Sequence, residues 1–361
     1  MKPVKVAIIS CTHGHAEGYY GIRYDKCFDL VAVSVAPGYE NSHNMPMLEG
    51  IPKYKTDVEL YENHPELEAV ILASENAYHM QHVREAVSRG LHILSMKVPT
   101  FHLEEYEEMI RISEEAGVVF QIELEMRHHA PVERVKRLIE SGAIGDLLSV
   151  NLVNYSVNPV CAWPWQCDPY LSYGEVVPLR PNDDRFRGGC LADHPHGFDV
   201  VRYLTGSEFD TIYADVSPNI RDFVKTEDMM RLIGKMKNGV SYSIDPSYAN
   251  DEQQRPDWEQ YERYPRIVEV FMTVVGTKGT IITDLYGKTY CCQTVPAGAY
   301  MVSPGLGSSG LWNRVTNEFY HCIRDGEKPT INLRNHYNTI RTMVAGYESV
   351  RTGEVIKINY E

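Results

Sequence analysis

AVILASENAYHMQHVREAVSRGLHILSMK, residues 69–97, decides the fold, because two short apolar runs flank one amphipathic stretch. Residues 69–73 and 91–95 are continuous apolar runs, which is typical of strands buried on both faces of a sheet. Between them, residues 79–89 predict a helix. A strand, a helix and a second strand of these lengths predict a β-α-β unit with parallel strands.

The same alternation extends along the first third of the chain. Apolar runs at residues 4–10, 28–35 and 118–122 predict further strands, and residues 103–116 predict another helix. Alternating strands and helices predict a parallel, doubly wound sheet. We therefore expect an α/β domain at residues 1–126, in which the carboxyl ends of the strands are the expected place for a ligand.

From residue 127 onward strand-like runs dominate. A helix is predicted at residues 131–141, and strands are predicted at residues 148–155, 211–216, 230–236, 241–245, 268–275 and 279–283. This pattern favours an α+β domain with a mostly antiparallel, open sheet at residues 127–361. We expect the final helix, at about residues 335–350, to pack back on the first domain.

Composition narrows the class of partner. The chain has 361 residues and a formal net charge of −14, without a sustained lysine and arginine stripe. These features disfavour nucleic acid and anionic membranes as partners, and they favour a small molecule. The start of the chain does not resemble a signal peptide, so we expect a cytoplasmic protein. The eight cysteines lack a C-x-x-C pair, which disfavours disulfides and structural zinc.

The turn after the first strand reads IISCTHGHAEG at residues 8–18. In a doubly wound fold, glycines at this turn let backbone amides approach a pyrophosphate. Only Gly14 and Gly18 remain here, and the alternative role of the polar residues is helix capping. The cofactor contacts that we expect in this turn come from Ser10, Thr12, His13, Gly14 and His15.

Polar residues also follow the strands of the opening β-α-β unit. Because parallel strands end at one edge of a sheet, these residues are expected to contribute to the cofactor site. They are Ser74, Asn76, His79 and Lys97. The second strand ends in Ser34, Val35 and Ala36, without a ribose-binding carboxylate or a phosphate-binding arginine. NAD is therefore expected, and NADP stays open.

Residues 188–206, GGCLADHPHGFDVVRYLTG, carry the candidate catalytic groups. Asp193, His196 and Asp199 are spaced three apart, so they share one face if a helix has already begun at Asp193. A histidine between carboxylates can move protons near neutral pH. The alternative is structural: Asp193 caps the helix, Pro195 lies in its first turn, and the histidines are exposed.

An aromatic loop at residues 155–173 precedes this segment. The rings of Trp163, Trp165 and Tyr170 are candidates for stacking on a sugar ring or an aglycone. The alternatives for this loop are an oligomer contact and a purely structural role.

Several motifs, in this order, make the chain resemble the glucose–fructose oxidoreductase, inositol dehydrogenase and rhizopine-catabolism (Gfo/Idh/MocA) family. They are ASENAYH at 73–79, MKVP at 96–99, RHHAP at 127–131, SGAIG at 141–145, the glycine-rich segment at 188–199, VGTKG at 275–279 and AGYESVRTG at 345–353. The resemblance implies a Rossmann domain that binds NAD or NADP, and an open sheet that carries the substrate pocket and an oligomer interface.

The resemblance also implies residue roles. Its catalytic lysine corresponds to Lys97, its active-site histidine to His196, and its aspartate to Asp193, which lies one residue closer to the histidine than in the family pattern. Arg127 and His194 join the substrate contacts. The implied activity is hydride transfer between the nicotinamide and a secondary hydroxyl of a sugar, polyol or glycoside, including oxidation at carbon three, by a homo-oligomer.

Three alternatives stay open at this point. One is a redox-neutral, NAD-dependent enzyme that cleaves glycosides, and another is a non-catalytic regulator that senses a nucleotide or a sugar. The third is a metal centre formed by Asp193, His194 and His196, whose carboxylate and imidazoles suit Zn²⁺ or Mn²⁺. Without it, no metal is expected.

Overall fold

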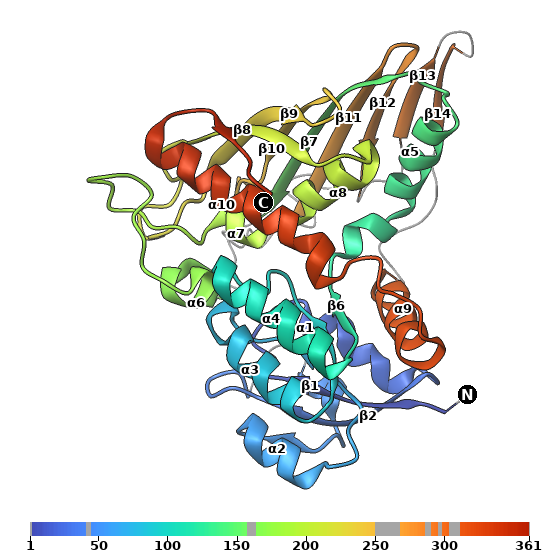
Figure 1. Cartoon of the computed structure of the whole chain (residues 1–361), viewed down its shortest axis with the longest axis vertical. Helices are drawn as coiled ribbons and strands as arrows, with labels where there is room; N and C mark the ends of the chain where they lie inside the picture. The colour runs from blue at the N-terminus through green and yellow to red at the C-terminus, as the bar shows by residue number, and fades with distance from the viewer. Residues whose placement is uncertain are drawn as a thin grey trace, which may run out of the picture. The chain divides into compact units, whose positions relative to one another are not determined.

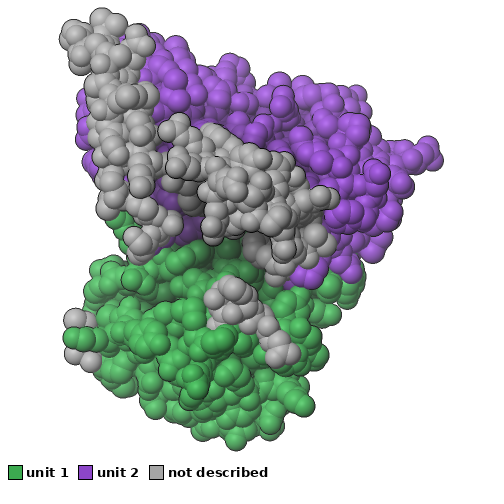
Figure 2. All heavy atoms as spheres, turned by 180° about the vertical axis from the view of Figure 1, so that it is seen from behind, with its two compact units in different colours: residues 1–124, 170–174, 312–337 green, residues 125–169, 175–311, 338–361 purple. Residues whose placement is uncertain are grey.

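The computed structural model describes residues 2–40, 45–156, 164–249, 268–285, 290–294, 298–302 and 311–360 (Figure 1). Trp163 lies outside these described residues. The chain divides into two compact units (Figure 2). Unit 1 comprises residues 1–124, 170–174 and 312–337, and unit 2 comprises residues 125–169, 175–311 and 338–361.

Unit 1 contains a six-stranded sheet in which the paired strands are all parallel. The order is β3-β2-β1-β4-β5-β6, with strands β1 (Val4–Ile9), β2 (Phe28–Ser34), β3 (Lys53–Tyr54), β4 (Ala69–Leu72), β5 (His92–Ser95) and β6 (Phe120–Ile122). This strand order is that of a Rossmann fold, so the predicted doubly wound sheet is confirmed.

Two helices of unit 1, α3 (Asn76–Ser88) and α4 (Leu103–Ala116), correspond to the predicted helices at residues 79–89 and 103–116. The unit also contains α1 (Ala16–Tyr19), α2 (Asp57–Asn63) and α6 (Pro169–Tyr173), and α9 (Leu311–Asp325) returns from much later in the sequence. Helix α4 ends at Gly117, which adopts φ +66°, a left-handed conformation that costs glycine little. The amphipathic stretch within residues 69–97 forms α3.

Helix α9 completes the core of unit 1. Phe319 and Val315 on this helix belong to the same buried cluster as Val6 and Ile8 of β1. The carbonyl oxygen of Val315 accepts a hydrogen bond from Gln121 Nε2 on β6, at 3.0 Å. The late segment is therefore part of the Rossmann unit, an arrangement that the sequence analysis did not predict.

Unit 2 contains a nine-stranded sheet in the order β14-β13-β12-β11-β7-β10-β9-β8-β15. Only β7 and β10 pair in parallel among the neighbours in this sheet, so the mostly antiparallel prediction is confirmed. The strands are β7 (Leu147–Ser156), β8 (Phe209–Val216), β9 (Met230–Met236), β10 (Ser241–Asp245), β11 (Val268–Gly276), β12 (Gly279–Asp284), β13 (Tyr290–Thr294), β14 (Gly298–Val302) and β15 (Ile356–Lys357).

Helices cover one face of this sheet (Figure 1). They include α5 (Ala130–Glu140), α7 (Cys190–Asp193), α8 (His196–Thr205) and most of α10 (Leu333–Thr352). A Cβ at Gly197 of α8 would lie 3.1 Å from Leu152 and Ile244, so the helix approaches the sheet closely. Alternate residues point away from the helices, and Ile233 and Ile282 are 53% and 55% exposed.

No helix among the described residues combines the length and the apolar character that crossing a membrane requires.

We predict that Phe319→Ala destabilises the protein by about 3–5 kcal/mol, because the ring is fully buried against the Rossmann core. Urea unfolding of the full chain measures this change. Val355→Ala, at a side chain that is 63% exposed, serves as the control and should change stability by less than about 0.5 kcal/mol. Equal effects of the two substitutions would show that α9 does not belong to this core.

Candidate cofactor and substrate sites

The turn after β1 adopts a glycine-like conformation without glycine. Ser10 and Cys11 have φ angles of 76° and 55°, in the left-handed region that side chains rarely occupy. The Ser10 N–H donates to Ser34 Oγ at 2.8 Å, and the amides of Thr12 and His13 donate to the Ala73 carbonyl oxygen at 2.9 Å. Hydrogen bonds to β2 and to the end of β4 therefore hold the turn where the family pattern uses glycine.

A buried chain of hydrogen bonds continues from this turn. Ser34 Oγ donates to Asp57 Oδ1 at 2.5 Å, and Asp57 Oδ2 lies 2.9 Å from His82 Nε2. The other ring nitrogen of His82 lies 2.8 Å from Ser74 Oγ. Burial alone would raise the pKa of Asp57, but hydrogen bonding to His82, the charge of His82 and the Ser34 hydroxyl bring it below its ordinary value.

Ser74, predicted as a cofactor contact, is thus already part of a structural chain. Sequence reasoning missed Asp57 and His82, because their contacts join segments that are far apart in the sequence.

His79 supports the two loops that follow β4 and β5. Its Nε2 lies 3.1 Å from the Ser74 carbonyl oxygen, and its Nδ1 lies 3.1 Å from the carbonyl oxygens of Val98 and Pro99. Burial lowers the pKa of His79 to about 4, so the ring is neutral at physiological pH. His79 therefore positions the loop that starts at Lys97, which is itself only 3% exposed.

Asn76 and the start of α9 make further contacts within unit 1. Asn76 Nδ2 donates to the Ser172 carbonyl oxygen at 2.9 Å, and its buried Oδ1 has no hydrogen-bond partner in the described part of the chain. His15 Nδ1 lies 3.1 Å from Glu123 Oε2, and its ring packs edge-on against Trp312. A Cβ at Gly18 would overlap Trp312, which explains the glycine at that position.

The candidate catalytic segment in unit 2 is broken into two helices. Helix α7 ends at Asp193 and α8 begins at His196, with Pro195 between them. The prediction that Asp193, His196 and Asp199 share one helix face is therefore wrong. The structural alternative also fails for the histidines, because His194 and His196 are buried, at 6% and 3% exposure.

Each acidic group of this segment has a partner from another element. Asp199 accepts two hydrogen bonds from the Arg127 guanidinium, both at 2.5 Å, and Asp193 Oδ2 accepts one from the Tyr248 hydroxyl at 3.2 Å. The carboxylate near His196 is Glu125, whose Oε2 lies 3.5 Å from Nδ1. Arg127, which was expected to contact the substrate, thus forms a buried ion pair with Asp199. Glu125 and Tyr248 were not predicted from the sequence.

His194 is held by the protein on both sides of its ring. Nδ1 lies 3.0 Å from the Cys190 carbonyl oxygen and 2.7 Å from that of Pro246, and Nε2 lies 3.1 Å from Ser156 Oγ. A substrate contact, or a metal site of Asp193, His194 and His196, would require His194 to give up these hydrogen bonds. The ring therefore acts as a structural link in this conformation.

The aromatic candidates differ in accessibility. Trp165 is buried in a short helical turn at Pro164–Cys167, whereas Tyr170 on α6 is 52% exposed and belongs to unit 1. Gln166, next to Trp165, donates to the Gly188 carbonyl oxygen at 3.3 Å. This part of the loop thus supports the glycine pair before α7.

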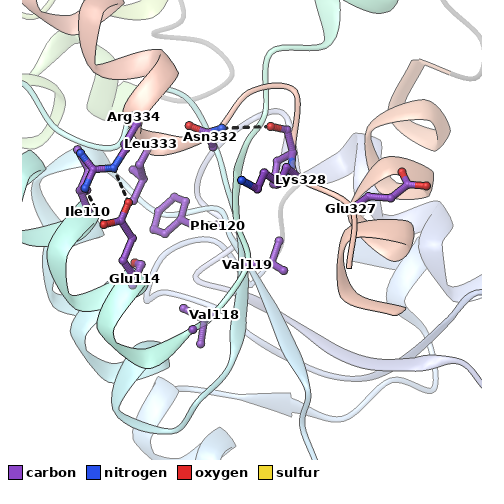
Figure 3. Close-up of a pocket in the computed structure, with 13 residues that line it drawn as sticks. Ile110, Glu114, Val118, Val119, Phe120, Glu327, Lys328, Asn332, Leu333 and Arg334 are labelled. Atoms are coloured by element: carbon purple, nitrogen blue, oxygen red, sulfur yellow. Dashed lines mark hydrogen bonds and ion pairs between the residues drawn. The ribbon is translucent and has the colours of Figure 1, made fainter. Parts of the chain in front are cut away.

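A separate groove of about 370 Å³ lies within unit 1 (Figure 3). Its described lining residues include apolar side chains of α4 and the segment before β6, and an ion pair in which Arg334 Nε lies 2.5 Å from Glu114 Oε1 borders it. None of the predicted cofactor or substrate residues is among this lining.

Comparison with known proteins identifies the family. Residues 4–124 match the oxidoreductase family with an NAD-binding Rossmann fold, and residues 132–282 match the GFO/IDH/MocA C-terminal domain. The chain belongs to the GFO/IDH/MocA family, and unit 1 carries its NAD-binding Rossmann fold. Both the predicted family and the predicted cofactor are confirmed.

Individual relatives are distant. The chain is 26% identical over 227 residues to "Uncharacterized oxidoreductase YrbE" of Bacillus subtilis, covering 61% of this chain and 56% of that protein. It is 25% identical over 312 residues to "D-xylose 1-dehydrogenase (NADP(+)) 2" of Haloferax volcanii, covering 86% of each. The matches span little more than half the length of the first two curated relatives.

The fold is shared with a solved oxidoreductase from Agrobacterium radiobacter in complex with NAD⁺, L-tartaric acid and magnesium. The TM-score is 0.75 at 20% sequence identity, covering 99% of this chain and 98% of that one.

The residues of unit 1 fit a dinucleotide. The strand ends present Asn76 Oδ1, an acceptor without a hydrogen-bond partner among the described residues, and the basic side chain of Lys97 as a donor. These are the donor, acceptor and charge types that phosphates and a carboxamide require.

We predict that Ser34→Ala weakens NAD binding about 5- to 10-fold, because the Ser10 N–H loses its acceptor and the left-handed turn loses about 1 kcal/mol of support. Calorimetric titration with NAD measures the dissociation constant. The matched control is Ser149→Ala on β7 in unit 2, which should leave that constant unchanged. An unaltered affinity in Ser34→Ala would mean that other contacts hold the turn.

Proposed function

We propose that this protein is an NAD(P)-dependent dehydrogenase that transfers a hydride between the nicotinamide and a secondary hydroxyl of a sugar or polyol. The observation that carries the proposal is that each unit supplies a buried proton-transfer group on a motif of this family. These groups are Lys97 after β5 in unit 1 and His196 at the start of α8 in unit 2. Relatives named as D-xylose, D-apiose and inositol dehydrogenases support the substrate class.

In this proposal His196 accepts the hydroxyl proton during oxidation. Imidazole side chains commonly serve as general acids and bases, and the Glu125 carboxylate orients the His196 ring through Nδ1. Lys97, buried after β5, is the candidate proton-transfer group of unit 1. Asp193, oriented by the Tyr248 hydroxyl, binds a neighbouring hydroxyl of the substrate.

The cofactor, when bound, accepts the hydride that leaves the carbinol carbon. The protein's contribution is to hold that carbon, exclude water from it and remove the hydroxyl proton. Tyr170, exposed on α6, is the described aromatic candidate for a contact with the sugar ring.

We also propose that the chain forms a homo-oligomer through the face of the nine-stranded sheet that lies opposite α5, α7 and α8. Ile233 and Ile282 lie in one row across that face, in register with Ser243 and Thr273 of the strands beside them. Exposed apolar side chains on a sheet face favour burial against a second copy.

We predict that Lys97→Ala and His196→Ala each lower the rate of hydride transfer about 10²- to 10⁴-fold, because each removes a proton-transfer group. Absorbance near 340 nm, recorded with NAD and a panel of pentoses, hexoses, inositols and aryl glycosides, measures the rate. Lys357→Ala and His321→Ala, both outside the proposed sites, are the matched controls.

Full activity in either site variant would exclude that residue from the chemistry. Cleavage of an aryl glycoside without net growth of the 340 nm band would replace net oxidation by redox-neutral chemistry. Binding of NAD and a sugar without turnover of any substrate would instead favour a sensor.

A further inference from the structure

Glu227 lies in the loop between β8 and β9 and contacts the start of α7. Its Oε1 accepts hydrogen bonds from the Leu191 N–H at 3.2 Å and from the Tyr347 hydroxyl at 2.7 Å. Its backbone carbonyl oxygen accepts a further bond from the Cys190 N–H at 2.8 Å. One buried residue therefore satisfies two consecutive amides that begin the helix ending at Asp193.

We call the hydrogen bonds that Glu227 accepts from residues 190, 191 and 347 the bracket. Tyr347 extends the bracket to the glycine pair at residues 188 and 189. Its hydroxyl has a single proton, which it donates to Glu227, and its oxygen accepts from the Gly188 N–H at 3.0 Å. Tyr347 lies on α10, so three segments far apart in the sequence meet here. The closing motif of the chain, residues 345–353, thus acquires a physical role at the candidate catalytic segment.

Glycine is required at position 189 because the backbone there lies close to Glu227. A Cβ on Gly189 would overlap the Glu227 carbonyl oxygen, so only glycine permits this close approach. The glycine pair before α7 therefore serves the contact with Glu227.

The surroundings of Glu227 are buried. The titratable and charged groups described near it are Tyr347, Arg185, Cys190 and Tyr248, with Asp228 next to it in the chain and Arg187 over the Tyr347 ring. Its second oxygen, Oε2, has no hydrogen-bond partner in the described part of the chain. Burial raises the pKa of Glu227 to about 7, although the hydrogen bonds oppose this shift.

We propose that Glu227, acting through Tyr347 and the amides of residues 188–191, is a positioning residue for Asp193 and His196, an inference that rests on the proposed function. The bracket is pH-dependent. Because folding raises the pKa of Glu227 above its ordinary value of 4.5, the stabilisation is fully present below pH 4.5 and is lost as pH rises through about 7. Local opening of residues 188–194 should increase over this range.

Hydrogen exchange tests the bracket without requiring turnover. Peptides covering residues 188–197 of the full chain are compared at pH 5.5 and 7.5, after correction for the intrinsic exchange rate. We expect protection in the wild type to fall several-fold between these pH values, and protection in Glu227→Gln to be independent of pH. Tyr347→Phe should lower protection at both pH values.

A matched variant serves as the control. Tyr242→Phe removes another buried hydroxyl in unit 2, one that donates to the Thr211 carbonyl oxygen, and it should keep the pH dependence of the wild type. An unchanged pH dependence in Glu227→Gln, or unchanged protection in Tyr347→Phe, would overturn the bracket.

Activity separates positioning from a merely structural role. We expect Glu227→Ala to lower kcat at least 10-fold with little change in the KM for NAD, and Glu227→Gln to restore most of the loss because the amide oxygen still accepts both bonds. The ratio of kcat in Glu227→Gln to that in the wild type should rise between pH 6 and 8. A constant ratio in an active enzyme would overturn the positioning role.

The two proposals fail differently. An inactive wild-type protein that shows the expected exchange pattern overturns the dehydrogenase and supports the bracket. An active wild-type protein without that pattern overturns the bracket alone.

Discussion

The parallel pairing of β1 with β4 is the constraint on which the cofactor site depends. The strands pair in register from Val6 opposite Ala69 to Ile9 opposite Leu72, so both strands end at the same edge of the sheet. The amides of Thr12 and His13 can then reach the Ala73 carbonyl oxygen, and the two loops are fixed against each other. Because both strands are buried on both faces, a slip in this register would expose apolar side chains as well as separate the loops.

The turn after β1 shows how side chains substitute for glycine. A left-handed residue other than glycine costs roughly 1–2 kcal/mol, and this turn contains two of them, Ser10 and Cys11. The chain from Ser34 through Asp57 to His82 supplies hydrogen bonds at the same place, and those to a charged carboxylate contribute more than neutral ones. The family motif is thus altered in sequence while the turn is retained.

The sequence predicted elements whose pattern is local and missed those whose stability comes from distant contacts. Residues 103–116, 230–236 and 241–245 form their elements with the predicted bounds, because periodicity alone defines them. Helix α9 was missed although its sequence is amphipathic, and its place in the Rossmann core depends on its packing with β1. In the candidate site, the spacing of Asp193 and Asp199 suggested one helix face, but the ion pair between Asp199 and Arg127 reflects a contact across 72 residues.

The candidate catalytic segment of unit 2 depends on buried polar groups more than on apolar packing. Arg127, Asp199 and Glu227 are each buried, and each would be costly if its partner were removed. Such groups contribute little net stability compared with apolar residues of the same size, but they have few alternative arrangements. Hydrogen bonds from β7, from the segment after β10, from α10 and from the loop before β9 therefore hold the segment that contains Asp193 and the break before His196. A segment held in this way can orient proton-transfer groups more closely than its own short helices could.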